Sequence, residues 1–349
     1  MKGALARPSG DITFERGNVV LHILGIGTTY PETLLTNEVL VELSGGSLTP
    51  DLLAATGIRS RASVLPLDYL RATGNTDAKL GEEAMALSPS DLATKAAEIA
   101  LARAGITADQ VGLILGDACS PLETTPSEAQ RLGARLNIKA NAYDVLTGGN
   151  GLLLHLSMLD GALPDRLPDI IVCFSANTPT QQVNYRTGHG APFLGDAATA
   201  IVVSPRLRGR LAVTDVFYAA DSVTDLVAFE TYGHVRIDAP KLSEYMGKRG
   251  ARVFTDLVST KAAGCANLAV VPPQFDAVSN AAVVNGGGVE DARIWSNLER
   301  RGYTVGAATF SVLAERWDSL QSGEDIALIG IGGGSNYGHA LLHVDEQSA

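Results

Sequence analysis

The sequence predicts an α/β protein built from two similar halves. Apolar runs of strand length alternate with amphipathic segments of helical length along most of the chain, and this alternation favours a mainly parallel sheet covered by helices. Around residues 205–209 (PRLRG) the pattern starts again. In each part an apolar strand ends in glycines and a later strand closes the unit, which indicates a structural duplication. We therefore expect an N-terminal extension over 1–18, a first half over 19–205 and a second half over 206–349.

The first half is expected to open with a strand over residues 19–27 (VVLHILGIG). Ser88 to Asp91 then has the form of a capping box with proline at the first helical position, and Gly105 marks the end of that helix. The run at 111–116 (VGLILG) is continuously apolar, which is typical of a strand covered on both faces. The other elements expected in this half are helix 127–136, strand 142–147, helix 150–162, strand 169–175 and strand 197–203.

The second half is expected to repeat the alternation of strands and helices. Within the first half, the segment from Ser63 to Leu87 is longer than a usual connection. Long ordered loops of this kind often cover a functional site. The elements expected in the second half are a strand beginning at 210–217, helix 252–266, strand 268–271, helices near 291–300 and 306–319, and strands 325–330 and 340–344.

Composition narrows the class of protein. The 349 residues carry a net charge of −11, which argues against a nucleic-acid partner, although a local basic mouth could still receive a phosphorylated ligand. The N-terminus lacks an apolar signal core, and no window approaches the ~18 apolar residues of a membrane span. The three scattered cysteines have no metal-ligand spacing and fit a reducing compartment. We therefore expect a soluble, cytoplasmic protein with no metal and no cofactor.

Two glycine motifs follow predicted strands without forming a dinucleotide site. Gly25-Ile26-Gly27 lacks the third glycine of that fingerprint, and a second motif at 332–334 leads into another strand instead of a helix. Close approach of neighbouring backbone explains both.

The turn at Gly148-Gly149 is the most informative local feature. A strand runs into it and a helix starts directly after it. Free backbone N–H groups and the positive end of a helix dipole meet at such a turn, which is where an enzyme would hold a cysteine as its thiolate. This turn carries no nucleophile.

A set of motifs in family order resembles the β-ketoacyl-[acyl-carrier-protein] synthase III-like family of the thiolase superfamily. The resemblance covers residues 20–345 and implies a layered αβαβα thiolase-like fold with two duplicated halves, and a dimer. Residues 63–77 further resemble ketosynthase III relatives of secondary metabolism. The motifs are GIGTTYP at 25–31, TGIRSR at 56–61, Pro126-Ser127, YDV at 143–145, FLGDA at 193–197 and GGGSNYG at 332–338.

The resemblance places all three catalytic side chains of the family on residues that cannot perform the same chemistry. The family's cysteine falls on Gly149, its histidine on Pro273 and its asparagine on Tyr303. Glycine cannot carry an acyl group, and the proline side chain has neither a donor nor an acceptor. Tyrosine keeps a hydroxyl but would fill the pocket for the extender unit.

Binding features of the family have counterparts here. The backbone N–H groups of Gly149 and Gly333 match its oxyanion donors. Arg59 and Arg61 are candidates to meet the phosphate of CoA or phosphopantetheine, although single arginines are more often solvated charges. The implied ligand is an acyl-CoA or an acyl-carrier-protein thioester.

Other residues could replace the missing chemistry or build an interface. Cys119, at the end of a strand, is the candidate for a relocated nucleophile, although a lone cysteine without a base is more often inert. His155 is expected to be a satisfied core histidine, and Asp196 a structural group that accepts backbone hydrogen bonds. By resemblance, the loop from Cys119 to Pro126 lies at a dimer interface with Thr125 facing the neighbour's acyl tunnel.

Three functions remain open at this point. The first is a catalytically silent ketosynthase III-like subunit that pairs with an active paralogue in fatty acid or polyketide-type metabolism, as a homo- or heterodimer that an acyl carrier protein could visit. The second is an acyltransferase or thioester hydrolase that uses Cys119 or water. The third is a non-catalytic protein that binds an acyl chain or acyl carrier. Loss of all three catalytic roles favours the first.

Overall fold

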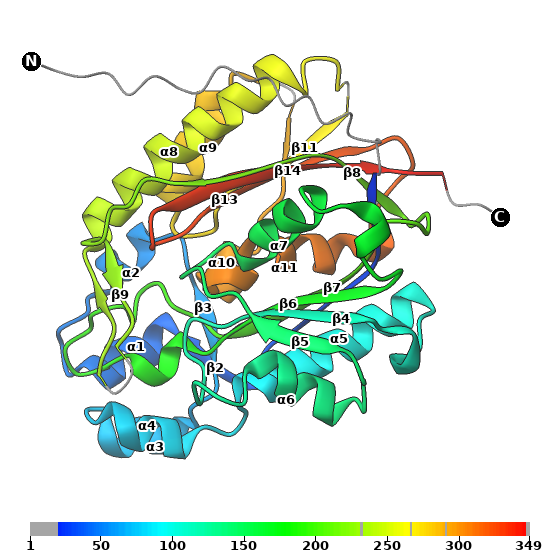
Figure 1. The fold of residues 1–349 in the computed structure, drawn as a ribbon. Coiled ribbons are helices and arrows are strands. Elements are labelled where there is room, and N and C mark those ends of the chain that lie inside the picture. Colours follow the sequence, from blue (N-terminus) through cyan, green and yellow to red (C-terminus); the bar gives the residue numbers. More distant parts are fainter. Residues whose placement is uncertain (1–19, 231–232, 266, 290–291, 347–349) are drawn as a thin grey trace, which may run out of the picture.

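The structure, a computed structural model, describes residues 20–230, 233–265, 267–289 and 292–346. The extension expected over 1–18 therefore lies outside the described residues. Two stacked halves of sheet have helices between them and on both outer faces (Figure 1). Among the residues that the structure describes, no helix has the length and apolar character needed to cross a bilayer.

The two halves share one strand order, which confirms the expected duplication. Each half places its third, second, fourth, fifth and first strand side by side, in the orders β5-β4-β6-β7-β1 and β12-β11-β13-β14-β8. A short antiparallel contact between β1 and β8 joins them. The strands are β1 (Leu21–Thr29), β4 (Leu113–Asp117), β5 (Asn141–Asp144), β6 (Ile171–Asn177), β7 (Ala197–Ser204), β8 (Leu211–Ala220), β11 (Leu268–Val271), β12 (Arg293–Ile294), β13 (Asp325–Ile331) and β14 (Asn336–Val344).

The expectation of a mainly parallel sheet was wrong. Only the pairs that involve β4 and β11 are parallel, and the other pairs are antiparallel. The chain returns from β6 to β7, and from β13 to β14, without the crossover helix that parallel neighbours need. Each half is therefore a mixed sheet.

Five layers result from the placement of the helices. Two helices cover the outer face of each half-sheet, and α7 and α11 lie between the halves (Figure 1). The central core contains Leu152 and Leu156 of α7 with Phe310 and Leu313 of α11, packed against strands of both halves. The helices of these layers are α5 (Pro89–Ala104), α6 (Glu128–Arg135), α7 (Gly151–Asp160), α8 (Ala239–Thr260), α9 (Ala277–Gly287) and α11 (Ala308–Arg316).

Helix α5 and strand β1 follow the predictions from sequence closely. Ser88 and Asp91 form the expected capping box, and Gly105 ends α5 in the left-handed conformation. A Cβ atom on Gly25 or Gly27 would lie 2.2 Å from a carbonyl oxygen of α5. Both glycines are thus required by close backbone approach, as predicted.

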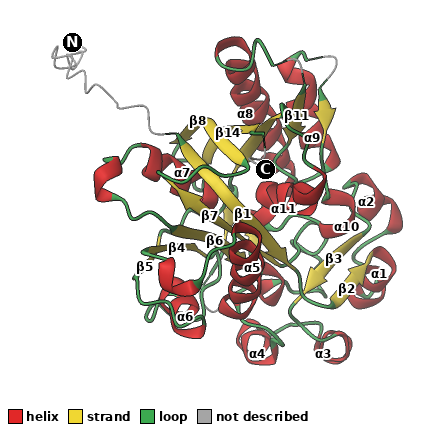
Figure 2. Ribbon diagram, turned by 90° about the vertical axis from the view of Figure 1, so that its right-hand side faces the viewer, coloured by secondary structure: helices red, strands yellow, loops and turns green. Residues whose placement is uncertain are grey.

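Smaller elements lie to one side of the layers (Figure 2). The segment from Ser63 to Leu87, expected to be a loop, contains α3 and α4. The helix expected over 252–266 begins at Ala239 and α9 was not predicted. Of the helix expected near 291–300, the described residues 292–297 are not helical. The smaller elements are β2 (Thr33–Thr36), α1 (Asn37–Ser44), α2 (Pro50–Ala55), β3 (Ser60–Ser63), α3 (Leu67–Thr73), α4 (Ala78–Ala84), β9 (Val227–Ala228), β10 (Arg236–Ile237) and α10 (Leu298–Arg301).

Candidate functional site

The turn between β5 and α7 has a backbone that only glycine adopts readily. Gly148 has a φ of +67° and Gly149 a φ of +126°, and Asn150, also at positive φ (+66°), precedes the first residue of α7. A side chain at position 149 would be strained whatever space surrounded it. The sequence therefore encodes a turn that is stable without a nucleophile.

A second glycine turn, between β13 and β14, lies against the first. The Asn336 side chain donates to the Thr147 carbonyl at 2.6 Å, and Asn150 donates to Asn336 Oδ1 at 2.8 Å. A Cβ atom on Gly149 would lie 3.8 Å from the Gly333 nitrogen. Gly149 and Gly333 are therefore neighbours, although they lie in different halves of the chain.

The backbone N–H groups of Gly149 and Gly333 are free donors. Neither N–H makes a hydrogen bond within the described part of the chain. Two unpaired N–H groups close together can stabilise a carbonyl oxygen or an oxyanion. Their assignment as oxyanion donors stays a prediction.

Tyr303 occupies the space in front of the first turn. Its hydroxyl lies 3.4 Å from the position that a Gly149 Cβ atom would take, and burial raises the pKa of this hydroxyl above its ordinary value. The Tyr303 ring packs edge-on against Phe275, with centroids 5.4 Å apart, and Phe275 stacks on Phe193 at 4.8 Å. Three aromatic rings thus form a continuous row that ends at Gly149.

Asp117, at the end of β4, lies behind the same turn. Its carboxylate accepts hydrogen bonds from the Ser175 hydroxyl at 2.7 Å and from the Thr147 N–H at 3.1 Å and hydroxyl at 3.2 Å. Burial raises the pKa of Asp117 to about 6. A Cβ atom on Gly151 or Gly306 would collide with the Asp117 side chain, so Asp117 is enclosed and holds the turn from behind.

Cys119 lies near the turn but lacks the surroundings of a nucleophile. Its N–H donates to Asn177 Oδ1 at 3.0 Å, and its thiol contacts the Ser120 hydroxyl at 3.8 Å. Burial raises the pKa of the Cys119 thiol, and Asp117 and Asp196 add to the effect because their charges disfavour a thiolate.

Pro273 and the two candidate arginines occupy different places. Pro273 is buried directly after β11, and no hydrogen bond or ring contact within the described structure links it to Gly149 or Tyr303. Arg59 is exposed and pairs with Glu299 at 2.6 Å.

Arg61, which the resemblance placed at a phosphate, is fully buried. Its guanidinium donates to Asn37 Oδ1 at 2.7 Å and to the Pro192 carbonyl at 2.5 Å. Burial lowers the pKa of Arg61 to about 10. Only Arg59 of the two has contact with solvent, so Arg61 has an internal, structural role in this structure.

Three further residues named from the sequence have clear surroundings. Thr125 is exposed on the loop between β4 and α6. Asp196 is buried and accepts from the backbone N–H groups of Val64 and Thr180, as expected of a structural group. The expectation that His155 is a satisfied core histidine was wrong, because neither of its ring nitrogens has a hydrogen-bond partner within the described residues.

A groove opens at the far end of the aromatic row. This cavity of about 780 Å³ is lined by apolar side chains that include Leu48 and Leu52 of the α1–α2 region, Phe193, Ile237 and Val278. We call it the Leu52 groove. Since Phe193 lines it and also starts the ring row to Tyr303, the groove and the Gly149 turn lie at opposite ends of one row.

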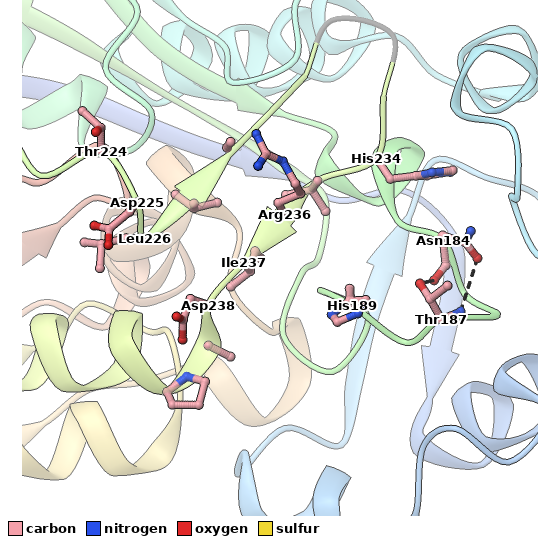
Figure 3. Close-up of a pocket in the computed structure, with 15 residues that line it drawn as sticks. Asn184, Thr187, His189, Thr224, Asp225, Leu226, His234, Arg236, Ile237 and Asp238 are labelled. Atoms are coloured by element: carbon pink, nitrogen blue, oxygen red, sulfur yellow. Dashed lines mark hydrogen bonds between the residues drawn. The ribbon is translucent and has the colours of Figure 1, made fainter.

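A second cavity of about 820 Å³ adjoins the groove (Figure 3). Figure 3 shows the loop that bears Thr187 and His189 facing strand β10, which bears Arg236 and Ile237. Thr187, His189 and Ile237 line both cavities. Ala239 and Pro240, the first residues of α8, also line both, so the two depressions meet at the start of that helix.

Asp117 and the rings of Phe193 and Phe275 were missed from sequence. A signal for Asp117 was present, because a single acidic residue ends the apolar strand LILGD. The rings left no signal, since isolated aromatic residues read as ordinary core.

Three comparisons with known proteins agree on one family. The family model "3-Oxoacyl-[acyl-carrier-protein (ACP)] synthase III C terminal" matches residues 268–344. A β-ketoacyl-[acyl-carrier-protein] synthase III of Chlamydia caviae is 27% identical over 345 residues, covering 93% of this chain and 97% of the relative. A 3-oxopimeloyl-[acyl-carrier-protein] synthase of Brucella abortus is 27% identical over 342 residues, covering 92% and 98%.

Solved structures show the same fold. The 3-oxoacyl-[acyl-carrier-protein] synthase III of Aquifex aeolicus superposes with a TM-score of 0.79 at 20% identity, covering 93% of this chain and 99% of that one. The priming β-ketosynthase of the R1128 polyketide pathway gives a TM-score of 0.78 at 18% identity, covering 94% and 97%. Full-length similarity, the matched C-terminal model and the duplicated five-layer fold lead to one conclusion: the chain has the fold of the β-ketoacyl-[acyl-carrier-protein] synthases III and is similar to them over more than nine tenths of its length.

Proposed function

We propose that this chain is an acyl-thioester-binding subunit that does not itself catalyse condensation and that pairs with an active ketosynthase III paralogue. The observation that carries the proposal is the position of the Tyr303 hydroxyl, 3.4 Å from where a side chain on Gly149 would begin. The place of the family's nucleophile has no reactive atom, and a side chain there would start in contact with the Tyr303 hydroxyl and 3.0 Å from the Gly332 Cα atom. The free N–H groups of Gly149 and Gly333 can still donate hydrogen bonds to a carbonyl oxygen.

Each of the three replaced positions removes a different step. Without a thiol at Gly149, no acyl-enzyme forms by nucleophilic attack. The Pro273 side chain cannot donate a hydrogen bond to a malonyl thioester during loss of CO₂. The Tyr303 ring takes volume that an extender unit would need, and Phe275 supports that ring from the side. The losses are independent, so repairing one should not restore condensation.

A relocated nucleophile at Cys119 is less well supported. Burial and the neighbouring carboxylates disfavour the thiolate of Cys119, and a thiol reacts only as its thiolate. A water activated by Asp117 is also disfavoured, because this carboxylate is enclosed and already accepts three hydrogen bonds.

Pairing with a paralogue is supported by the edge of the first half-sheet. Strand β5 is the outermost strand and pairs only with β4. Tyr143 within this strand and Leu146 just after it are 46% and 60% exposed. An uncovered strand edge with large apolar side chains is a surface that proteins usually cover with a partner.

An activity assay tests the catalytic part of the proposal. The purified chain is incubated with acyl-CoA and malonyl-carrier protein, and both condensation and covalent acylation are followed, the latter by intact mass. We expect neither product. A condensation rate like that of an intact relative would disprove the proposal, and an acyl adduct mapped to Cys119 would establish the transferase or hydrolase alternative.

A second assay tests the pairing. An intact ketosynthase from the same pathway is co-expressed, and the complex is followed by co-purification and sedimentation. Thr125→Phe in this chain should then change the chain length of the partner's product, since a larger side chain would enter its acyl tunnel. A monomer that ignores every neighbouring ketosynthase would leave the acyl-binding protein, supported by the Leu52 groove, as the remaining function.

A further inference from the structure

The charges around the Leu52 groove disfavour the binding of an anionic ligand. Among its lining residues the only charged side chains are Glu244, Lys248 and Asp276. Lys248 is neutralised by Glu244 at 2.5 Å, one helical turn away on α8. With the lining histidine counted as neutral, the formal charge is +1 from lysine and −2 from the two carboxylates, which leaves −1.

Two of the helices that begin at the groove, α8 and α9, already hold carboxylates at their N-termini. A helix N-terminus normally attracts phosphate through its free N–H groups and its dipole. At α9 the Asp276 carboxylate accepts from the Ser279 N–H at 2.7 Å. At α8, whose first residues also line the groove, the Asp238 carboxylate accepts from the Lys241 N–H at 3.3 Å. The N–H groups that could bind an anion at these two helix ends are therefore already bound by the chain's own carboxylates.

Arginines near the groove are engaged elsewhere. Arg61 is buried against Asn37 and the Pro192 carbonyl. Arg186, on the loop that forms one wall, donates to the carbonyls of Leu43 and Arg71. Neither guanidinium is available to offset the negative lining, and neither lines the groove.

We infer that the Leu52 groove accepts the uncharged chain of an acyl thioester and excludes the nucleotide phosphates of coenzyme A. The inference rests on the proposed function, which supplies the acyl thioester as the class of ligand. Apolar walls favour the chain, whereas a phosphate would meet a negative lining and two capped helix ends. Asp276 is the specificity-determining residue, because its carboxylate supplies the unpaired charge and fills the seat on α9.

The test compares two probes with the same acyl chain. Lauroyl-CoA carries the nucleotide phosphates, and S-lauroyl-N-acetylcysteamine carries none. Dissociation constants are measured by calorimetry at low and at high ionic strength. We expect the neutral thioester to bind roughly three- to tenfold more tightly at low ionic strength, with a smaller difference at high salt, because salt screens the repulsion.

Substitutions of single charges assign the effect. Asp276→Asn keeps a good helix cap and should lower the ratio of the CoA and neutral dissociation constants by roughly threefold or more. Glu244→Gln, which leaves Lys248 without its partner, should lower the ratio in the same direction and serves if the first variant does not fold. Asp169→Asn, an exposed carboxylate paired with Arg206, changes the net charge equally and should leave the ratio unchanged.

The outcomes separate the inference from the proposed function. Tighter binding of lauroyl-CoA, or an equal response of all three variants, overturns the charge-exclusion inference alone. Binding of neither probe overturns the acyl-thioester ligand class, and the inference with it.

Discussion

His155 is the residue whose surroundings differ most from those expected of its type. Its ring is fully buried in α7, and both nitrogens lack partners among the described residues. Burial lowers the pKa of His155 from 6.5 to about 4, and the nearby Gly116 carbonyl opposes the effect only in part. In the folded protein this imidazole is therefore neutral at any ordinary pH.

Stability should depend on pH through His155. Because its folded pKa lies below the unfolded value, the unfolded chain binds the proton more readily between about pH 6.5 and pH 4. The free energy of unfolding is unaffected by this histidine above pH 6.5 and falls as the pH drops toward 4. This loss totals about 3 kcal/mol. His155→Leu should remove it, as denaturant unfolding at several pH values would reveal.

The quantity to compare at each pH is the difference in unfolding free energy between the wild type and His155→Leu. Asp117 has the opposite sign, because its pKa is raised from 3.8 to about 6 and its ionised form costs stability as the pH rises through that window. Subtracting the two curves cancels this carboxylate and leaves the histidine. A difference that stays constant from pH 7 to pH 4 would show that the imidazole titrates normally.

Gly149 limits what engineering can restore. A Cβ atom there would lie 3.0 Å from the Gly332 Cα atom, on a backbone with a φ of +126°. Both Gly149→Cys and Gly149→Ala should therefore cost about 1–3 kcal/mol of unfolding free energy, and the cysteine variant should still not condense. Gly264→Ala is the control, because a Cβ atom there meets open space; its stability should change by less than about 0.5 kcal/mol. Unchanged stability at position 149 would mean that the turn relaxes freely.

At the scale of elements, the contact between α5 and β1 should tolerate no added side chain. A Cβ atom on Gly27 would lie 2.2 Å from the Ala96 carbonyl oxygen, and neither backbone can move without disturbing its own hydrogen bonds. We expect Gly27→Ala to cost roughly 3 kcal/mol, at the upper end of overpacking. Thermal or denaturant unfolding measures it.

Gly105 provides the comparison within the same helix–strand unit. It ends α5 at a φ of +66° with open space around the Cβ position, so Gly105→Ala should cost only about 1 kcal/mol from its backbone conformation. If the two variants lost equal stability, the close approach at Gly27 would not be the limiting contact.

Sequence predicted those elements whose ends carry their own signals. Helix α5 has a capping box at Ser88 and a glycine at its C-terminus, and both were identified correctly. Helix α9 was missed because its residues AVSNAAVVNGG are small and β-branched, with no amphipathic stripe. The start of α8 was placed too late, although Asp238 caps it.

The residues of the candidate site likewise divide into those with a local sequence signal and those without one. The Gly148-Gly149 turn could be located because a strand, a glycine pair and a helix follow one another in sequence. The burial of Arg61 could not be predicted, because its partners Asn37 and the Pro192 carbonyl come from distant segments. The row of rings from Phe193 through Phe275 likewise exists only once the chain has folded.

For the whole molecule, the shared strand order explains why the site lies where it does. In each half a central helix follows the third strand, α7 after β5 and α11 after β12. The Gly148-Gly149 turn precedes α7, and Tyr303 precedes α11. The site therefore combines equivalent positions of the two halves: the first half provides an empty turn, and the second provides the ring that fills the space before it.

The β5 edge should be an interface of the assembled molecule. Leu146 is 60% exposed just after β5, and covering it in an interface would contribute about 1–2 kcal/mol. Leu146→Asp should therefore weaken self-association, or association with the paralogue, by roughly tenfold or more. Leu163→Asp is the matched control, because Leu163 is 63% exposed beyond the opposite end of α7. Sedimentation equilibrium measures both variants, and equal dissociation constants for the two, or a wild-type chain that stays monomeric with and without the paralogue, would rule out the β5 edge as an interface.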